Sequence, residues 1–407
     1  MEQREPVVLD PAGQDPFAEA ARFRADGPAV RVTLPGDVTA WYVTRHEVLR
    51  DLLVDDRVSK DPNQHWPEWI NGRHRDGWLR NWIGVTNMLT AYGPDHRRLR
   101  KLVSPAFTAR RTAAMRPRVE RITRELLDDL AAAPPGETVD LRGRYAHPLP
   151  MRVICELFGV PEEHRPEVAR VIDRLMDTTI TPAEAMATYQ DVQKALGALI
   201  ELKRSSPADD MTSVLVAGRD EDDASLGEQE LLDTLLLIIG AGHETTVNLI
   251  GNAVHALLTH PEQLALLRSG KVGWNDVIEE TLRWAPSISA LPMRFAVADI
   301  PLEDGTVIRA GDPILTTYGA AGHDPAKHGA DADRFDASRA TTEHLAFGHG
   351  VHHCLGAPLA RMEAAIALPA LFERFPDLAL AREASELRHV DSFIAHGFAE
   401  LPVRLTA

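Results

Sequence analysis

The stretch Phe347-Gly348-His349-Gly350-Val351-His352-His353-Cys354-Leu355-Gly356 contains the densest group of chemically active side chains in this 407-residue sequence. Its first two glycines permit a tight loop with positive φ, and Gly356 lets a backbone or a flat ligand approach closely. Cys354 stands where the loop enters a predicted helix, so the unpaired N–H groups of the first turn point back toward the sulfur. That field favours the thiolate, which is the form of cysteine that binds metals.

Three interpretations of this loop remain open from spacing alone. The first is a structural turn with a buried cysteine, the commonest role of a lone cysteine. The second is a zinc or other metal site formed by His349, His352, His353 and Cys354. The third is a thiolate on haem iron. Zinc is the weakest of the three, because Cys/His zinc sites draw paired ligands from two separated segments and only one cluster occurs here.

A second group, Gly240-Ala241-Gly242-His243-Glu244-Thr245-Thr246, falls within a helix predicted from Glu230 to Thr259. That helix is apolar on nearly every side, which indicates burial through the centre of a domain. Each interior glycine costs roughly 1 kcal/mol relative to alanine, so we expect something to pack flush against the backbone. Glu244 and Thr245 then indicate either a kink, with the threonine bonded to its own turn, or a proton relay beside a ligand cavity.

A third pair, Glu280 and Arg283, lies three residues apart on a helix predicted from Trp274 to Trp284. Residues at this spacing share one helix face and can pair. An isolated pair of this kind is usually a solvated bridge of small energetic value, so alone it indicates no function.

Composition limits the class of protein. Hydrophobic residues make up 44%, and 60 acidic against 44 basic residues give a net charge of −16. A chain this acidic is a poor general nucleic-acid binder. No apolar run approaches the ~18 residues of a membrane span, and the first residues lack the apolar region of a signal peptide. Two cysteines, Cys155 and Cys354, exclude a disulfide framework. We expect a cytoplasmic protein with no membrane and no nucleic-acid partner.

Periodicity predicts a mainly α fold with a minor β region. We find no internal repeat and no long linker, and therefore expect a single domain over residues 1–407. Ser225 and Glu228 have the spacing of a capping box that opens the long helix. Alternation and turns predict short strands and hairpins in residues 290–316, followed by a loop-rich stretch from Tyr318 to Phe347. The other predicted helices are Met115–Leu130, Arg152–Phe158, Ala183–Lys203 and Leu355–Phe375.

Taken together, the order of an acid–threonine helix, a Glu-x-x-Arg pair and a Phe-x-x-Gly-x-x-x-Cys-x-Gly loop resembles the cytochrome P-450 superfamily over essentially the whole chain. Residues 91–100 (AYGPDHRRLR) and 344–350 (HLAFGHG) resemble the soluble bacterial branch that oxidises macrolides and steroids. The resemblance implies the cytochrome P-450 fold, with haem b (iron protoporphyrin IX) held between the long central helix and the Cys-loop helix.

The resemblance also implies the roles of individual residues. Cys354 would be the axial ligand of the haem iron, whose thiolate favours O–O cleavage. Thr245 would hold dioxygen or a water, and Glu244 would relay protons, as a longer carboxylate than the aspartate of many relatives. Glu280, Arg283 and Arg339 match a structural trio. The remaining implied cofactor contacts are His96, Arg100, Arg294 and His352 at the propionates, together with Phe347, Gly348, Ala241 and Gly356.

Family topology further implies where substrate would bind. The loop from Pro62 to Thr90 contains Trp66, Trp69, Trp78 and Trp82, of which we expect about half to face the pocket. The predicted pocket residues are Trp82, Ile83, Val85, Met88, Leu89, Met176, Ile180, Ile238, Ala241, Ser287, Ile288, Ala290, Leu291, Phe393 and Ile394. This set is apolar with few hydroxyls, so a bulky neutral hydrophobic molecule fits better than a fatty acid, for which no carboxylate anchor is evident.

The implied activity is that of a haem-thiolate monooxygenase that hydroxylates a steroid or macrolide with dioxygen and electrons from a ferredoxin and its ferredoxin reductase. Arg97, Arg98, Lys101, Arg110 and Arg111 form a basic cluster that could steer an acidic partner, although a plain solvated face explains them too. The alternatives are a haem-binding carrier or sensor without oxygenase activity, against which Glu244 and Thr245 argue, and a phenol-coupling or epoxidising member of the same family.

Overall fold

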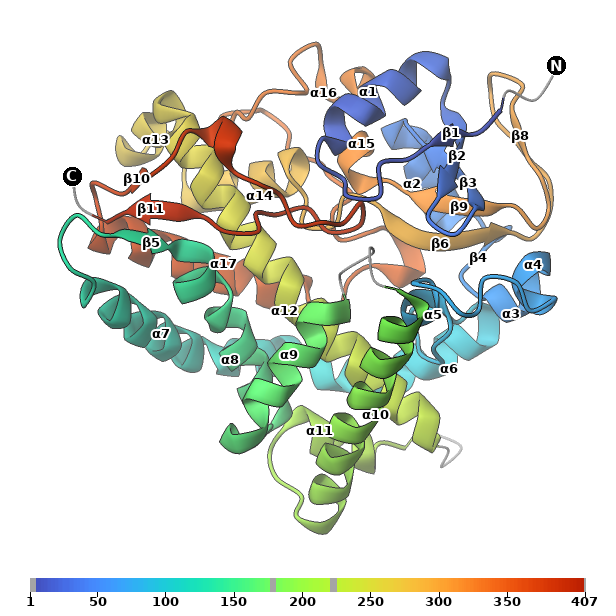
Figure 1. Cartoon of the computed structure of the whole chain (residues 1–407), viewed down its shortest axis with the longest axis horizontal. Helices are drawn as coiled ribbons and strands as arrows, with labels where there is room; N and C mark the ends of the chain where they lie inside the picture. The colour runs from blue at the N-terminus through green and yellow to red at the C-terminus, as the bar shows by residue number, and fades with distance from the viewer. Residues whose placement is uncertain (1–4, 176–180, 220–224, 406–407) are drawn as a thin grey trace.

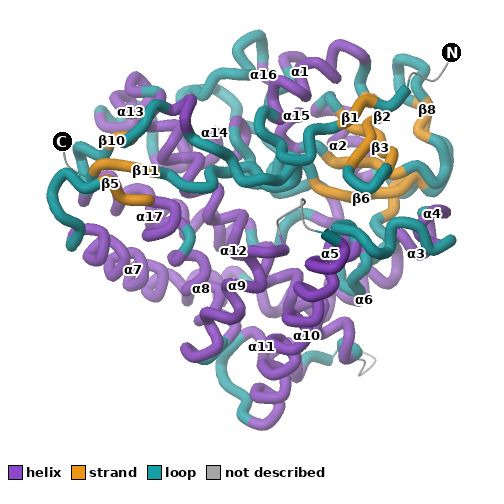
Figure 2. The backbone as a smooth tube through the Cα atoms, viewed as in Figure 1, coloured by secondary structure: helices purple, strands orange, loops and turns teal. Residues whose placement is uncertain are grey.

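The computed structural model describes residues 5–175, 181–219 and 225–405. Helix α12 (Glu228–Thr259) runs diagonally through the molecule, and the other long helices lie around it (Figure 1). The strands gather mainly at the opposite side from α7 (Ala109–Ala131), as Figure 2 shows. The prediction of a mainly α fold with a minor β region is therefore confirmed.

Helix α12 is buried on nearly every side, as its apolar sequence predicts. Its start differs from the prediction. The helix begins at Glu228, and the Glu230 carboxylate accepts a hydrogen bond from the N–H of Gly227 at 2.8 Å. Ser225 stands two residues before this N-cap, too early to cap the helix. The predicted capping box at Ser225 and Glu228 is thus wrong by two residues, because Gly227 and Glu230 occupy the capping positions.

The helices predicted from periodicity are present with slightly longer or shifted ends. Met115–Leu130 lies within α7, and Trp274–Trp284 is α14 without change. Gly159, at φ 64°, ends α8 in the left-handed conformation that glycine adopts most easily. The other observed helices that correspond to predicted ones are α8 (Pro148–Phe158), α10 (Pro182–Ser205) and α17 (Ala357–Arg374).

The largest hydrophobic core lies where α7, α8, α12, α14 and α17 pack together. On α7, Val119, Ile122 and Leu130 recur at helical spacing, and none of the three side chains is exposed. Burying one such side chain contributes about 1.5–3 kcal/mol. This core fixes α17 against α12 at the point where the Cys354 loop enters α17.

A six-stranded sheet has the order β1-β2-β3-β9-β6-β4. In it, β4 pairs antiparallel with β6, with Val58 opposite Ala296 and Ser59 opposite Phe295. The hairpin of β7 and β8 turns at Gly305, as the alternation in residues 290–316 predicts. The strands are β1 (Val7–Val8), β2 (Ala29–Leu34), β3 (Val38–Val43), β4 (Val58–Ser59), β5 (Thr138–Asp140), β6 (Leu291–Ala296), β7 (Ile300–Pro301), β8 (Val307–Ile308), β9 (Pro313–Thr316), β10 (Ala379–Leu380) and β11 (Pro402–Arg404).

Short helices occupy parts of the chain where periodicity gives little signal. Two of them, α15 (Tyr318–Gly322) and α16 (Pro325–His328), lie in the stretch predicted to be rich in loops. The remaining helices are α1 (Pro16–Asp26), α2 (His46–Val54), α3 (Pro62–His65), α4 (Pro67–Ile70), α5 (Arg80–Ile83), α6 (Gly93–Val103), α9 (Arg165–Leu175), α11 (Met211–Ala217) and α13 (Pro261–Arg268). Within the described ranges, every helix is too short or too polar to cross a membrane.

Candidate active site

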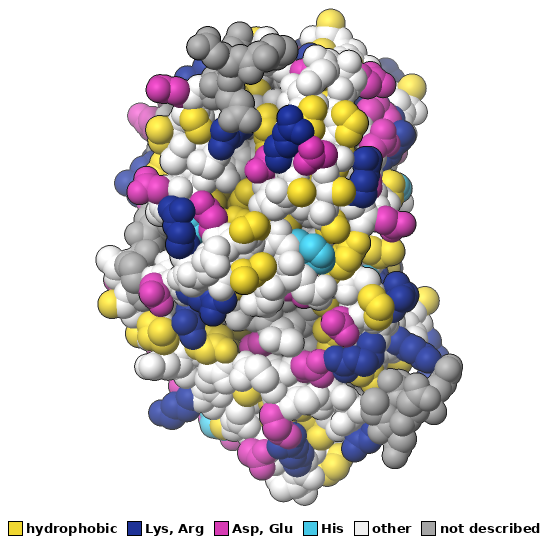
Figure 3. Space-filling model, turned by 90° about the vertical axis from the view of Figure 1, so that its right-hand side faces the viewer, with side chains coloured by type: hydrophobic (Ala, Val, Ile, Leu, Met, Phe, Trp, Pro, Cys, Tyr) yellow, Lys and Arg dark blue, Asp and Glu magenta, His cyan; other side chains and the backbone are white. Residues whose placement is uncertain are grey.

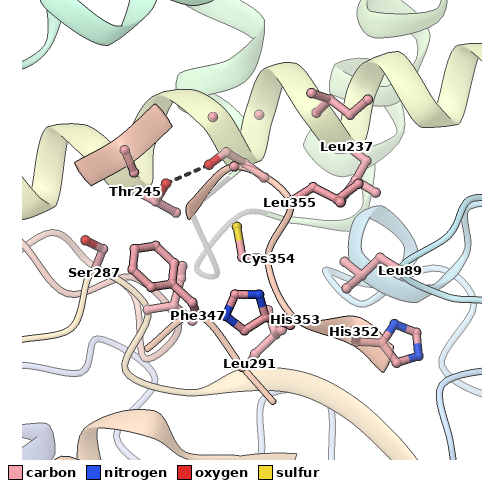
Figure 4. Close-up of a pocket in the computed structure, with 18 of the residues that line it drawn as sticks. Leu89, Leu237, Thr245, Ser287, Leu291, Phe347, His352, His353, Cys354 and Leu355 are labelled. Carbon is pink, nitrogen blue, oxygen red and sulfur yellow. Dashed lines mark hydrogen bonds between the residues drawn. The ribbon is translucent and has the colours of Figure 1, made fainter. Parts of the chain in front are cut away.

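A cavity of about 300 Å³ lies between α12 and the loop that precedes α17. The Cys354 sulfur points into this space from the loop, and Thr245 lines it from α12 (Figure 4). Ser287, Leu291 and Phe347 line the same cavity. The structure therefore brings two of the three predicted motifs to one place.

The loop backbone sets the position of Cys354. Gly348 and Gly350 have φ of 72° and 71°, the left-handed region that other residues rarely adopt. A Cβ on Gly350 would also lie 2.9 Å from Val54 Cγ1 of α2. The Cys354 N–H donates to the Phe347 carbonyl at 2.9 Å, which closes the loop at the start of α17.

The Cys354 side chain opens onto the cavity, so the interpretation as a buried structural cysteine is wrong. Burial raises the pKa of the thiol, although the N–H groups of Gly356 and Ala357 and the charges of Arg100 and Arg361 lower it. The N–H groups at the start of α17 therefore favour the thiolate, as predicted, but burial outweighs them in the chain without a metal. A metal at the sulfur would reverse this balance, since a coordinating thiol is deprotonated.

The histidines of the loop do not gather around the sulfur as zinc ligands. In the described ranges, no group of three or more His, Cys, Asp or Glu side chains is arranged to hold a metal ion. His352 instead contacts His96 of α6, with ring centroids 4.1 Å apart and the ring planes tilted by 47°. The loop thus offers a metal only the Cys354 sulfur, so the other ligands of the metal would have to come from a bound group. A porphyrin provides such ligands.

A cluster of cations and histidines lies at one edge of the cavity. The structure places Arg100, Arg294 and His352 on the cavity wall, and His96 reaches them through its contact with His352. Arg294 is only 4% exposed and makes no ion pair with a described carboxylate, and His96 Nε2 is buried without a hydrogen-bond partner. Buried positive groups with no acid nearby fit the two propionates of haem. The sequence missed Lys60, which lines this same edge.

Burial and neighbouring cations keep the histidines of this cluster neutral. Burial, followed by the charges of Arg100 and Arg294, lowers the pKa of His96 to about 4. The pKa of His352 is lowered more, again mainly by burial. Both rings are therefore hydrogen-bonding groups at neutral pH, while the arginines carry the charge.

Thr245 and Glu244 face different surroundings. Thr245 Oγ1 donates to the Ala241 carbonyl at 2.6 Å, the dashed bond in Figure 4, and also lines the cavity. The threonine thus bonds to its own turn and also faces a cavity, and its part in a proton relay stays a prediction. Glu244 is 4% exposed, does not line the cavity, and accepts hydrogen bonds from Arg142 Nη2 at 3.0 and 3.3 Å. Because the Arg142 guanidinium does not give up a proton, the Glu244 carboxylate would have to release Arg142 before it could carry one.

Gly240 and Gly242 of α12 have different surroundings. A Cβ on Gly242 would lie 2.7 Å from Ile154 Cδ1, so α8 packs flush against the helix there. Gly240 and Ala241 line the cavity instead. The expected close approach to the backbone is confirmed at Gly242.

The Glu-x-x-Arg pair is fully buried. Arg283 Nε lies 2.7 Å from Glu280 Oε2, with neither side chain exposed, and Arg339 Nε lies 3.1 Å from Glu280 Oε1. Arg283 also donates to the carbonyls of Gly322, Ala332 and Arg334. The interpretation as a solvated bridge is wrong, since these bonds tie α14 to the segment that leads to the Cys354 loop.

The predicted pocket residues divide into two groups. Those that line the cavity are Trp82, Val85, Met88, Leu89, Ile238, Ala241, Ser287, Ile288 and Leu291. Those buried in the core beside the sheet instead are Ile83, Ala290, Phe393 and Ile394, together with Trp66, Trp69 and Trp78. The correction follows from packing: Phe393, for example, meets Trp78 edge to face at 5.3 Å. Met176 and Ile180 lie outside the described residues.

Several lining residues escaped the sequence analysis. Helical spacing from Ala241 could have identified Leu237, but no local pattern indicates Asn81 on the short helix α5. Both polar atoms of the Asn81 amide are buried without a hydrogen-bond partner. The other missed residues include Asn87, Phe107, Ile154, Leu236, Thr246, Tyr318 and Glu363.

The segment after α5 is fastened to α12. The Asp233 carboxylate accepts hydrogen bonds from the Thr86 N–H at 2.6 Å and from Gln229 at 2.8 Å. The Asn87 amide donates to the Asp233 carbonyl at 3.1 Å. These bonds hold one wall of the cavity against the helix that carries Thr245.

Comparison with known proteins gives concordant results. The cytochrome P450 family model matches residues 274–387. The 2-hydroxy-5-methyl-1-naphthoate 7-hydroxylase of Streptomyces carzinostaticus is 44% identical, over 98% of this chain and 97% of the relative. The 6-deoxyerythronolide B hydroxylase of Saccharopolyspora erythraea is 40% identical, over 96% of both chains. A structure of testosterone-bound CYP154C4 from Streptomyces sp. ATCC 11861 is 43% identical, covers 99% of each chain and superposes with a TM-score of 0.94.

Proposed function

The chain belongs to the cytochrome P450 family and is a haem-dependent monooxygenase, and from this premise we propose that it hydroxylates a bulky, neutral, hydrophobic molecule of the steroid or macrolide class. Dioxygen would be the oxidant and a ferredoxin chain the source of electrons. The observation that carries the proposal is the cavity itself, which places Cys354 opposite Thr245 beneath an apolar wall.

Haem b supplies the oxygen chemistry when bound, while the chain supplies ligand, pocket and protons. Cys354 would hold the iron, supported by the N–H groups of Gly356 and Ala357. His96, Arg100, Arg294 and His352 would hold the propionates. The flat faces of the group would meet residues that line the cavity without charge: Ala241, Phe347, Gly348 and Gly356.

The Thr245 hydroxyl would position a proton donor, such as a water, at the cavity. Its hydroxyl already donates to the Ala241 carbonyl, so its own oxygen remains free to accept a hydrogen bond from a water or a bound molecule. Glu244 would supply protons to that position from the Arg142 side of α12. The same arrangement disfavours a simple carrier, which needs no hydroxyl at this point.

The character of the cavity wall supports a neutral substrate. The lining from α5 through residue 89 and from α12 is mostly apolar, whereas the described cations that line the cavity are Lys60, Arg100 and Arg294. These cations cluster beside His352, where the haem would bind. A molecule above the haem would thus meet Asn81 and Ser287 as polar partners, which suits alcohol and ketone groups. Relatives described as acting on an erythronolide and as binding testosterone agree with this choice.

An aromatic acid is the second candidate, because the naphthoate hydroxylase is 44% identical to this chain. The two candidates differ in one testable respect. A carboxylate needs a cation or a strong donor where the substrate binds, and burying it unpaired costs much more than burying a ketone.

The experiment is a titration of the purified haem protein with a steroid, a macrolactone and a hydroxynaphthoate, scored by the shift of the haem absorption band. Product analysis with dioxygen and a surrogate ferredoxin chain would follow for each molecule that binds. Binding and hydroxylation of the steroid or the macrolactone would support the proposal. Binding of the naphthoate alone would contradict it in favour of the second candidate, and products of epoxidation or phenol coupling would contradict the reaction type.

A further inference from the structure

Lys60 is an unusual residue to bury. It follows β4, its side chain lines the cavity, and it is only 2% exposed. Its ammonium has one hydrogen bond in the described ranges, a long contact of 3.4 Å to the Pro292 carbonyl, and no ion pair with a described carboxylate. Burial of an ammonium without a counter-ion is strongly unfavourable, so Lys60 calls for an anion that the chain itself does not provide.

A neighbouring cation on β6 makes the burial of the Lys60 ammonium still less favourable. Val58 lies opposite Ala296 and Ser59 opposite Phe295, where β4 ends, and the next residues in these directions are Lys60 and Arg294. Residues opposite one another on paired strands project to the same face, and like charges at such positions repel. Burial and the charge of Arg294 together lower the pKa of Lys60. Lys60 and Arg294 therefore lie near each other in one buried region, and among the described residues neither pairs with a carboxylate.

The chemistry of the anion follows from the neighbours of this pair. Arg294 and Lys60 share the cavity edge with Arg100 and His352, and His352 contacts His96. Haem carries two propionates, and this edge provides two arginines, one lysine and two imidazoles to receive them. A carboxylate on the haem would neutralise the repulsion between Lys60 and Arg294 and would provide Lys60 with a charge-assisted hydrogen bond.

We propose that Lys60 binds a haem propionate jointly with Arg294, as an additional cofactor-binding residue that retains the haem in its cavity. The inference rests on the haem site proposed above. Lys60 touches the cofactor and not the reacting atoms, so its removal changes how firmly haem is held and the potential of the iron more directly than it changes the choice of substrate.

The test compares holoenzymes carrying Lys60→Met, Lys60→Gln and Lys60→Arg. The matched control is Lys271→Met, which removes an exposed lysine far along the sequence. One readout is the rate of haem transfer to an excess of haem-free myoglobin, and the other is the reduction potential of the haem. A merely structural role of Lys60 would not move the potential.

We expect Lys60→Met and Lys60→Gln to lose haem roughly ten- to a hundredfold faster than wild type, the range of a hydrogen bond to a charged group. Their reduction potential should fall, because a less neutralised propionate favours the ferric state. Lys60→Arg should restore both values, and Lys271→Met should match wild type.

Two outcomes overturn the inference. One is haem loss at the wild-type rate in both neutral variants, and the other is a Lys60→Arg protein that behaves like Lys60→Met. The reduced carbon monoxide spectrum of the wild type is recorded first. If that spectrum is not of a thiolate-ligated haem, the proposed haem site fails; if it is, unchanged haem loss refutes only the role of Lys60.

Discussion

The hydroxyl of Thr245 is the single group of α12 that both bonds to its own helix and faces the cavity of Cys354. Its bond to the Ala241 carbonyl fixes the hydroxyl hydrogen and leaves the oxygen free as an acceptor. The nearby acid, Glu244, is turned away and paired with Arg142. On the proposed function, proton delivery at the cavity would therefore depend first on the threonine.

Replacing Thr245 by valine keeps the side-chain shape and removes the hydroxyl. We expect a severalfold fall in product formed per dioxygen consumed and a matching rise in hydrogen peroxide, because general acid–base assistance is lost while binding is kept. The measurement is the amount of product and of hydrogen peroxide formed per dioxygen consumed. Thr259→Val is the matched control, since Thr259 makes the same bond to its own helix at the far end of α12. Unchanged coupling in Thr245→Val would contradict the role.

Asn81 allows a second prediction at the residue scale. Its amide has a donor and an acceptor without partners, so an oxygenated substrate gains a hydrogen bond there. Asn81→Leu should weaken binding of a hydroxy- or keto-steroid about three- to tenfold, as expected for a neutral hydrogen bond. A hydrocarbon analogue should bind equally well or better. The measurement is the dissociation constant from the haem absorption shift, with the exposed Asn71→Leu as control. Equal weakening for both ligands would exclude a specific hydrogen bond.

Between elements, buried histidines join α1, α14, α15 and the C-terminal segment. His323 stacks on Phe17 at 4.2 Å and hydrogen-bonds to the Trp284 carbonyl at 2.6 Å, and His396 packs edge to face on the same Phe17 ring. Burial lowers the pKa of His323 to about 4. The neutral ring is therefore part of the packing between these elements.

This packing makes stability depend on pH. Because the pKa of His323 is about 4 in the folded chain and about 6.5 when unfolded, the unfolded state binds more protons between these values. Stability therefore falls as the pH drops from 6.5 toward 4, by about 2 kcal/mol at pH 5 for this one group. Urea unfolding of wild type and His323→Gln at pH 7.5 and 5 measures the effect. The variant should be less stable at pH 7.5 yet lose less on acidification. An equal loss of stability on acidification in wild type and in His323→Gln would contradict this prediction.

At the scale of the whole molecule, surface charge bears on the choice of partner, and on the face in Figure 3 Lys and Arg side chains are interspersed among Asp and Glu. The basic cluster predicted for partner docking is smaller in the structure than in the sequence. Arg98 pairs with Glu230, and Arg111 lies 3.6 Å from Asp209. Arg97, Lys101 and Arg110 remain exposed. A docking site for an acidic ferredoxin would therefore rely on these three.

Reversing the charge of Arg97 and Lys101 to glutamate should slow reduction by an acidic ferredoxin more than tenfold at low salt and little at high salt, because steering is screened by ions. Stopped-flow reduction over a range of ionic strength measures this. The matched control reverses Arg374, which is exposed on α17. Equal rates of the double variant and wild type at low salt would leave the cluster as a plain solvated face.

The features that could be predicted from the sequence are those that neighbouring residues encode. The apolar run of α12 and the spacing around Cys354 need no distant partner to be recognised. Lys60 and Asn81 could not be predicted, since their burial depends on how β4 meets β6 and how α5 lies against α10 and β6. The same reason explains the errors at Ile83 and Phe393, whose side chains turn to the sheet core rather than to the cavity.

The central claim is that the sulfur of Cys354 binds the iron of a haem in this cavity. The most direct test is the carbon monoxide spectrum of the reduced purified protein, with Cys354→Ser as the comparison. We predict the absorption band of a thiolate-ligated haem in the wild type and its loss in the variant. A wild-type spectrum like that of a histidine-ligated globin, or a protein that stays colourless when supplied with haem, would contradict the account.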